Sequence, residues 1–358
     1  MKARLDASSL PMEAWLYAIV LIVPASVLIG HGSGGAWHWL TPLIVFGIIP
    51  VLDHLIGVDT RNPFPDKPTE APGLNVCQAI TWLCAPVQIG LVVWGAGVIS
   101  GGTTGWIESI GLTVSVGISS GILGINASHE LQHRVNHPAE IWLSRLMLLT
   151  VGYMHWAIEH VIGHHRHVAT PRDPATARLG ESFYRFLPRT IVGGFQSAWM
   201  IEEQGLARAK KAPLSHHNRI LRYGLAQILF VALLVKIFGW AALPYWLLQS
   251  AVAVVLLEVI NYVEHYGLRR QRRGQGYAPV EVRHSWNASY WLTNHFLFNL
   301  QRHADHHYRP GRRYPYLRHF KESPQLPTGY AGMILLAVVP PVWRRVMDKR
   351  VCAIAHQK

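Results

Sequence analysis

Six long apolar segments are the feature that most restricts how this chain can fold. The hydrocarbon core of a bilayer is about 30 Å thick, so a helix needs roughly 20 mostly apolar residues to cross it. A helix also satisfies its own backbone hydrogen bonds, which lipid cannot do. We therefore predict an all-α protein, a bundle of six transmembrane helices near residues 15–29, 37–56, 76–99, 107–127, 221–240 and 243–263.

The composition agrees with a membrane protein. Half of the 358 residues are hydrophobic and only 15% are charged, against about 25% charged residues in soluble domains. Two further apolar stretches, 141–157 and 333–346, are predicted to lie at the membrane surface, because Arg145 interrupts the first and Pro340 and Pro341 break the second. We treat residues 1–358 as one integral-membrane domain.

The positive charges lie on one side of this predicted topology. The connections that hold no Lys or Arg are 31–36, 100–106 and 241–242. The opposite side receives Lys2, Arg4, Arg61, Lys67 and the long segments 128–220 and 266–358. By the positive-inside rule that side is cytoplasmic, with both termini on it. Topology and contact with anionic lipid then account for the net charge of +13. Since no RNA- or DNA-binding motif accompanies the charge, we expect no nucleic-acid partner.

Nine of the 21 histidines are candidate metal ligands, and they lie in four clusters. All four fall at the cytoplasmic ends of predicted spans or in cytoplasmic segments, so they can converge at one depth. Imidazole is a ligand for iron, copper and zinc, and nine ligands suit two ions with four or five each. We therefore predict a histidine-rich cytoplasmic cap that holds a dinuclear metal site. The clusters are "SHELQHR" with His129 and His133, "EHVIGHHRH" with His160, His164 and His165, "NYVEHYGL" with His265, and "LQRHADHHYRP" with His303, His306 and His307.

Helical spacing predicts which histidines share a face. Residues four apart lie on one side of an α-helix, so His160 and His164 should align, with His165 turned by about 100° toward a second metal. The sequence "HELQH" also has the H-E-x-x-H spacing of zinc proteases. That alternative needs only one more protein ligand, and it leaves six clustered histidines unexplained.

Together, H-x3-H, H-x3-HH and H-x2-HH resemble the histidine boxes of membrane fatty-acid desaturases and hydroxylases. "NYVEHYG" narrows the resemblance to alkane and xylene monooxygenases. "GHHRHVATPRDPATARLGESFYRF", "RHSWN" and "LQRHADHHYRPGRRYPYLRHF" look like bacterial alkane 1-monooxygenase. The similarity runs from about Pro50 to "PPVWRRVMDKR". One departure is His167, which stands where the family commonly has aspartate, and we take His167 as a non-ligand.

The resemblance implies two non-haem iron ions with nine histidine ligands: His129, His133, His160, His164, His165, His265, His303, His306 and His307. Polar neighbours of these ligands are expected to accept the free imidazole N–H and fix the ring, although the same residues could simply form a solvated polar face. They are Glu130, Glu159, Glu264, Asp305 and His284.

The implied activity is hydroxylation of the terminal methyl of medium- to long-chain n-alkanes to 1-alkanols with dioxygen, at the bacterial inner membrane. The chain has no flavin or nicotinamide fingerprint and no four-cysteine iron site. The resemblance therefore implies that rubredoxin, reduced by an NADH-dependent reductase, supplies electrons. Its docking candidates, which could equally be charges facing the membrane surface, are Arg269, Arg270, Arg272, Arg273, Arg312 and Arg313.

The substrate is expected to enter from the bilayer. In the family a bulky residue on the second span limits alkane length, and the matching position here is Val45, whose small side chain would leave a deep channel open. Two alternatives remain. A desaturase, fatty-acid hydroxylase or xylene-type methyl monooxygenase would share the metal site, whereas a metal transporter or sensor would need polar residues along a path through the spans.

Overall fold

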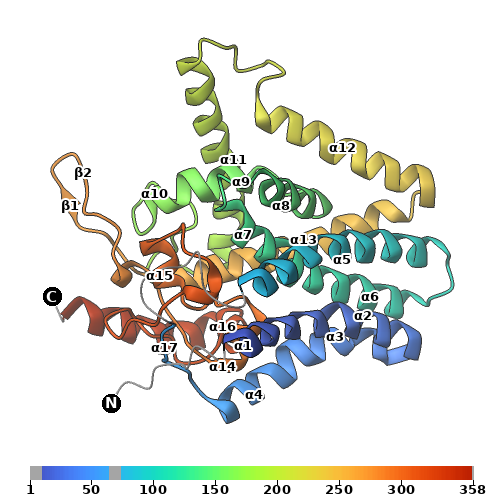
Figure 1. Cartoon of the computed structure of the whole chain (residues 1–358), viewed down its shortest axis with the longest axis horizontal. Coiled ribbons are helices and arrows are strands. Elements are labelled where there is room, and N and C mark those ends of the chain that lie inside the picture. Colours follow the sequence, from blue (N-terminus) through green and yellow to red (C-terminus); the bar gives the residue numbers. More distant parts are fainter. Residues whose placement is uncertain (1–9, 64–73, 357–358) are drawn as a thin grey trace.

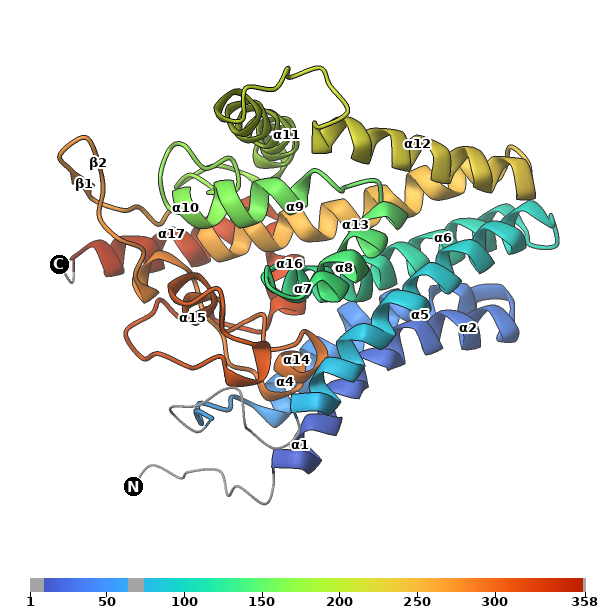
Figure 2. The same cartoon turned by 45° about the horizontal axis from the view of Figure 1, so that its top comes forward.

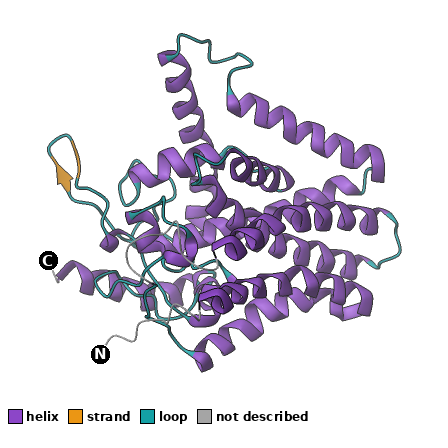
Figure 3. Cartoon of the chain, in the orientation of Figure 1, coloured by secondary structure: helices purple, strands orange, loops and turns teal. Residues whose placement is uncertain are grey.

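The computed structural model describes residues 10–63 and 74–356. Lys2, Arg4 and Lys67, on which the predicted orientation partly rests, lie outside the described residues. Helices make up most of the described chain, and many of the loops gather at one end (Figure 3). The six-span, all-α prediction is confirmed, because the described residues contain six helices long and apolar enough to cross a membrane: Glu13–Ser33, Gly35–Ile56, Leu74–Ser100, Trp106–Gln132, Arg219–Phe238 and Ala242–His265.

Several spans are built from more than one helical segment. The first contains α1 (Leu10–Leu16), the 3-10 turn η1 (Tyr17–Leu21) and α2 (Ile22–Ser33). The second contains the 3-10 turn η2 (Gly35–Trp39), α3 (Leu40–Leu43), the π-helix η3 (Ile44–Ile48) and α4 (Ile49–Ile56). The third is α5 (Leu74–Ser100). The fourth contains α6 (Trp106–Ser119), the π-helix η4 (Ser120–Ile125) and α7 (Asn126–Gln132). The fifth and sixth are α12 (Arg219–Phe238) and α13 (Ala242–His265).

Shorter elements lie between the fourth and fifth spans and after the sixth. The first group is α8 (Pro138–Thr150), α9 (Trp156–Ile158), the π-helix η5 (Glu159–His164), α10 (His165–His167) and α11 (Phe183–Arg208). The second group is the antiparallel hairpin β1 (Arg272–Arg273) and β2 (Gly276–Tyr277), η6 (Val282–His284), α14 (Trp291–Phe296), α15 (His303–Tyr308), η7 (Tyr314–Tyr316), α16 (Tyr330–Ala337) and α17 (Pro340–His356).

The spans run away from the end of the molecule that carries the short elements. In two views α2, α5, α6 and α13 extend to one side, whereas α10, α15, α17 and the hairpin lie at the other (Figures 1 and 2). The fourth span is the central one, since 83% of its most apolar window is buried, against 11% for α12. Its last segment, α7, packs against α8 and carries His129.

Of the two stretches predicted to lie at the membrane surface, the first differs in detail from its prediction and the second agrees with it. The apolar stretch 141–157 is interrupted, because α8 ends at Thr150 and Gly152 adopts a φ of +65°. A Cβ at Gly152 would lie 2.8 Å from the Trp246 ring, so glycine permits both the turn and the close packing. The break predicted in 333–346 is present, and α17 restarts at Pro340, where proline fits the first helical turn.

Candidate metal centre

A π-helix determines how the second histidine cluster is arranged. Hydrogen bonds in a π-helix join residues five apart rather than four, and η5 covers Glu159–His164. His160 and His165 therefore point the same way, with their Nε2 atoms 3.1 Å apart. The predicted pairing of His160 with His164 is wrong, because it assumed α-helical spacing. His164 instead lies 3.2 Å, Nε2 to Nε2, from His307.

The nine predicted histidines form two groups, each with its ligand atoms within 4.8 Å of one another. Neighbouring Nε2 atoms are 2.9–3.2 Å apart, as between His133 and His160 or between His303 and His307. Two nitrogens that bind one ion at about 2.1 Å and at right angles are separated by about 3 Å. The first group is His129, His133, His160, His165 and His306, and the second is His164, His265, His303 and His307.

The electrostatics of these histidines suit metal binding. Burial, together with the neighbouring histidines, holds the pKa of most of them well below its ordinary value, so they are neutral at neutral pH. A neutral imidazole is the form that binds a metal. Outside the spans this holds for His133, His160, His165, His303, His306 and His307.

Asp173 fixes one ring of the second group and was missed by sequence reasoning. Its Oδ2 lies 3.0 Å from Nδ1 of His164, so it accepts the N–H on the far side of the ring from the metal-facing Nε2. Burial lowers the pKa of His164, but the charge and hydrogen bond of Asp173, together with the charges of Glu159 and Glu264, raise that pKa to about 9. The only sequence signal was an acidic residue in "PRDPAT", nine positions beyond His164.

The carboxylates expected to contact ligand rings lie elsewhere in two cases. Glu130 forms a buried ion pair with Arg134, and Arg134 also donates to the carbonyls of Gly311 and Arg312. Asp305 accepts from the backbone N–H of Arg318 at 2.9 Å and lies 3.5 Å from the guanidinium of Arg312. These two expectations are corrected, because arginines rather than imidazoles compensate both buried charges.

The remaining predicted neighbours lie close to the centre. Glu159 is buried, and burial raises its pKa to about 8. His284 is buried, and its Nδ1 accepts the backbone N–H of Glu281 at 2.9 Å. His167 belongs to neither histidine group of the described chain. Glu264 contacts a ring of the second group directly, since its Oε2 lies 3.1 Å from Nε2 of His303.

The proposed docking arginines divide into two kinds. Arg269, Arg272 and Arg273 are exposed, the last two on the protruding hairpin (Figure 1). The others are tied into the fold. Arg270 donates to the carbonyls of Ala278, Arg166 and Val168, Arg313 pairs with buried Glu140 at 3.0 Å, and Arg312 contacts Asp305.

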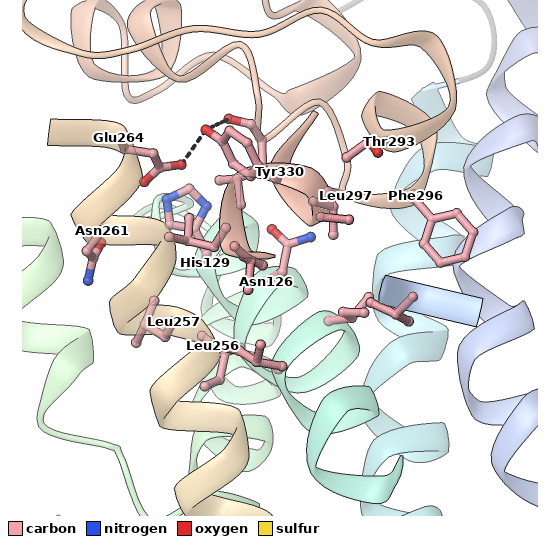
Figure 4. A pocket seen from close by; sticks show the side chains of 18 of the residues that line it. Asn126, His129, Leu256, Leu257, Asn261, Glu264, Thr293, Phe296, Leu297 and Tyr330 are labelled. Carbon is pink, nitrogen blue, oxygen red and sulfur yellow. Dashed lines mark hydrogen bonds between the residues drawn. The ribbon is translucent and has the colours of Figure 1, made fainter. Parts of the chain in front are cut away.

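An apolar cavity between the spans ends on the histidines. Leu256 and Leu257 line one part of it, while Glu264, Tyr330 and His129 line another (Figure 4). The walls are mostly aliphatic, which suits a substrate without polar groups. Val45, buried within η3, belongs to this wall. The other lining residues include Phe46, Ile49, Ile122, Ile125, Trp156, His160, Ile260, Phe296, Leu300, His303 and Ile334.

The comparison with protein families supports the same class of molecule. The fatty acid desaturase family model matches residues 104–337, which is more than half of the chain. The two histidine groups within a helical membrane bundle are consistent with that match. The chain thus belongs to the fatty acid desaturase family. Its two histidine groups indicate a metal-dependent enzyme.

Curated relatives narrow the assignment. The chain is 42% identical over 346 residues to alkane 1-monooxygenase 2 of Pseudomonas aeruginosa, covering 95% of this chain and 91% of the relative. It is 41% identical over 337 residues to alkane 1-monooxygenase 2 of Alcanivorax borkumensis, with 93% and 88% covered. The xylene/toluene monooxygenase hydroxylase component of Pseudomonas putida is 30% identical over 345 residues, with 94% and 89% covered. Within the family, the chain belongs to the alkane 1-monooxygenases and is an oxidoreductase.

The geometry argues against the zinc-protease alternative. A protease of that type needs the glutamate of H-E-x-x-H as a general base, but Glu130 is paired with Arg134. His129 and His133 also converge with three further histidines, which leaves a larger donor set than the three protein ligands of a catalytic zinc site. The transporter alternative is disfavoured by the mainly aliphatic walls of the cavity that reaches the centre.

Proposed function

We propose that the protein hydroxylates the terminal methyl group of medium- to long-chain n-alkanes to 1-alkanols. One oxygen atom of dioxygen enters the C–H bond, and the other leaves as water with two electrons and two protons. The observation that carries this proposal is the apolar cavity that ends on ligand histidines of both groups, His129 and His160 of one and His303 of the other.

The proposed cofactor is a pair of iron ions, one in each histidine group. Bound iron would supply the activation of dioxygen, which side chains alone cannot perform. The chain's own residues have three tasks. Most of the buried histidines present neutral nitrogens, Asp173 orients the His164 ring, and the aliphatic walls exclude water and position the alkane. Each buried CH2 of the substrate contributes about 0.8 kcal/mol of binding.

The proposed electron donor is rubredoxin, reduced by its NADH-dependent reductase. The exposed arginines Arg269, Arg272 and Arg273 are the positions that we propose for docking, because an acidic partner would be steered toward them. We further propose that residues 1–358 act as a single catalytic domain in the bacterial inner membrane, with the metal centre and both termini on the cytoplasmic side. The charge distribution of the loops supports this orientation.

The test is reconstitution. Iron-loaded protein, rubredoxin, its reductase and NADH are mixed with a series of n-alkanes, and products are identified by gas chromatography. We expect 1-alkanols, and no product from a matched His165→Ala variant, which lacks one ligand of the first group. Turnover of an acyl substrate without any 1-alkanol would favour the desaturase or fatty-acid hydroxylase alternative, and preferential oxidation of an aryl methyl group would favour the xylene-type alternative.

A further inference from the structure

Glu264 occupies an unusual place in the centre. It lies in the last turn of α13, directly before His265, and only 2% of its surface is exposed. It also lines the apolar cavity, together with His129, His160 and His303. A buried carboxylate in such surroundings needs compensation by a positive charge or by hydrogen-bond donors.

The Glu264 carboxylate contacts the metal-facing nitrogen of a histidine. Its Oε2 lies 3.1 Å from Nε2 of His303, the same atom that lies 3.2 Å from Nε2 of His265 and 2.9 Å from Nε2 of His307. The other ring nitrogen of His303, Nδ1, is buried without a hydrogen-bond partner in the described part of the chain. Asp173 shows the contrasting arrangement, because it contacts Nδ1 of His164 and leaves Nε2 facing the group.

This geometry is incompatible with the expected role of Glu264 as an acceptor of a free imidazole N–H. When Nε2 of His303 binds a metal, it carries no proton that Glu264 could accept. A carboxylate oxygen about 3 Å from one ligand nitrogen is instead where a neighbouring ligand of the same ion would lie. The hydroxyl of Tyr330 donates to the other oxygen, Oε1, at 2.6 Å (Figure 4), which leaves Oε2 available.

We propose that Glu264 is a fifth protein ligand of the second metal position, through Oε2, and that Tyr330 holds the carboxylate in place. The inference rests on the proposed two-metal function and deepens it. The first position then has five imidazoles, and the second has four imidazoles and a carboxylate. The two ions are inequivalent, and the carboxylate ligand stands at the wall of the substrate cavity.

The test measures metal binding rather than turnover. Wild-type protein and Glu264→Gln are loaded with 57Fe and compared by iron content, by release to a chelator and by Mössbauer spectroscopy. Glutamine keeps the shape and removes the charge. We expect one of the two irons in Glu264→Gln to be released at least about 10-fold faster, with a changed signal for that iron alone. Glu258→Gln is the matched control, since Glu258 is buried on the same helix and is held by Tyr153 and Thr190.

A second variant keeps the inference testable should Glu264→Gln fail to fold. Tyr330→Phe retains the carboxylate but removes its hydrogen bond, so we expect faster release of the same iron. Unchanged release and unchanged spectra in the folded Glu264→Gln variant, or in Tyr330→Phe where only that variant folds, would overturn the assignment, whatever the alkane assay shows. Conversely, failure of wild-type protein with two irons to form 1-alkanol would refute the proposed function and leave the assignment of Glu264 intact.

Discussion

Individual residues around the centre differ in what they contact, although their sequence positions look alike. Glu130 and Glu264 each stand directly beside a ligand histidine in the chain, yet Glu130 pairs with Arg134 and Glu264 contacts Nε2 of His303. Asp173, which adjoins no ligand in the sequence, is the carboxylate that binds a ligand's far nitrogen. A carboxylate that adjoins a histidine of the two groups in sequence therefore need not contact a histidine ring in the structure.

Asp173→Asn is expected to weaken metal binding in the second group. Asparagine keeps the shape but not the charge that fixes the His164 ring, and losing such a partner typically costs 10–100-fold in metal affinity or activity. Iron content after mild chelation and the rate of 1-alkanol formation measure the effect. Glu202→Gln, which breaks a pair with Arg219 far from the histidines, is the control. Equal iron retention in both variants would contradict the role of Asp173.

Val45→Trp is expected to shorten the preferred alkane. Val45 is only 6% exposed and lines the cavity, so an indole there would fill space that a long chain needs. Val51→Trp is the matched control, because Val51 lies one helical segment further on the same span and is 57% exposed. The product profile over an alkane series is the readout. An unchanged preference in Val45→Trp would show that this wall does not limit chain length.

At the scale of elements, π-helical turns recur where the functional residues are placed. One contains Val45, one directly precedes α7 with His129, and η5 contains His160 and His164. The π-helical geometry also explains why two histidine clusters of different spacing, one in η5 and α10 and one in α15, place their side chains alike. In α15, His303 pairs with His307 four residues on, whereas in η5 His160 pairs with His165 five residues on. A π turn thus lets H-x3-HH and H-x2-HH present equivalent sets of ligands.

The close packing of η5 on α11 gives a testable consequence. A Cβ at Gly163 would lie 2.8 Å from Oε1 of Glu159 and 3.0 Å from Oγ of Ser197, so Gly163→Ala should destabilise the protein by about 1–3 kcal/mol through overpacking. Gly194→Ala on α11, where nothing lies within 4 Å, should be neutral or stabilise by up to about 1 kcal/mol. Thermal unfolding in detergent compares the two. Similar melting temperatures would refute the packing argument.

The sequence predicted the six spans, because length and hydropathy alone decide whether a helix can cross a bilayer. It also predicted the nine histidines that the structure brings together. It could not predict their division, since this depends on η5 being a π-helix, which the spacing of the residues does not reveal. Nor could it reveal Tyr330 or Asp173, because each meets its partner through loops whose course depends on the whole fold.

For the molecule as a whole, the two histidine groups join residues of the fourth and sixth spans to residues of the segments between and after the spans. Without metal, the buried histidines keep low pKa values, whereas in the unfolded chain their pKa is about 6.5. The unfolded state then binds more protons as the pH falls, so stability is lost below about pH 6.5. His164 has a raised pKa and acts in the opposite sense, but six histidines outside the spans oppose it.

We therefore expect iron removal to lower the melting temperature at neutral pH and to lower it further as the pH is reduced from 7.5 to 5.5. Ligand that binds only the folded state stabilises it by mass action, so the iron-loaded protein at each pH serves as the control. Tryptophan fluorescence in detergent follows the transition. A metal-free protein whose melting temperature does not change over this range would contradict the expected titration.

The division of the histidines also has a consequence for how the protein is made. His306 completes the first group. In the second group, His265 is the last residue of the sixth span, and His303 and His307 follow that span. During synthesis the first group is complete only at residue 306 and the second only at residue 307, after all six spans have been made. A metal ion bound by either group is therefore expected to enter only after all six spans have been synthesised.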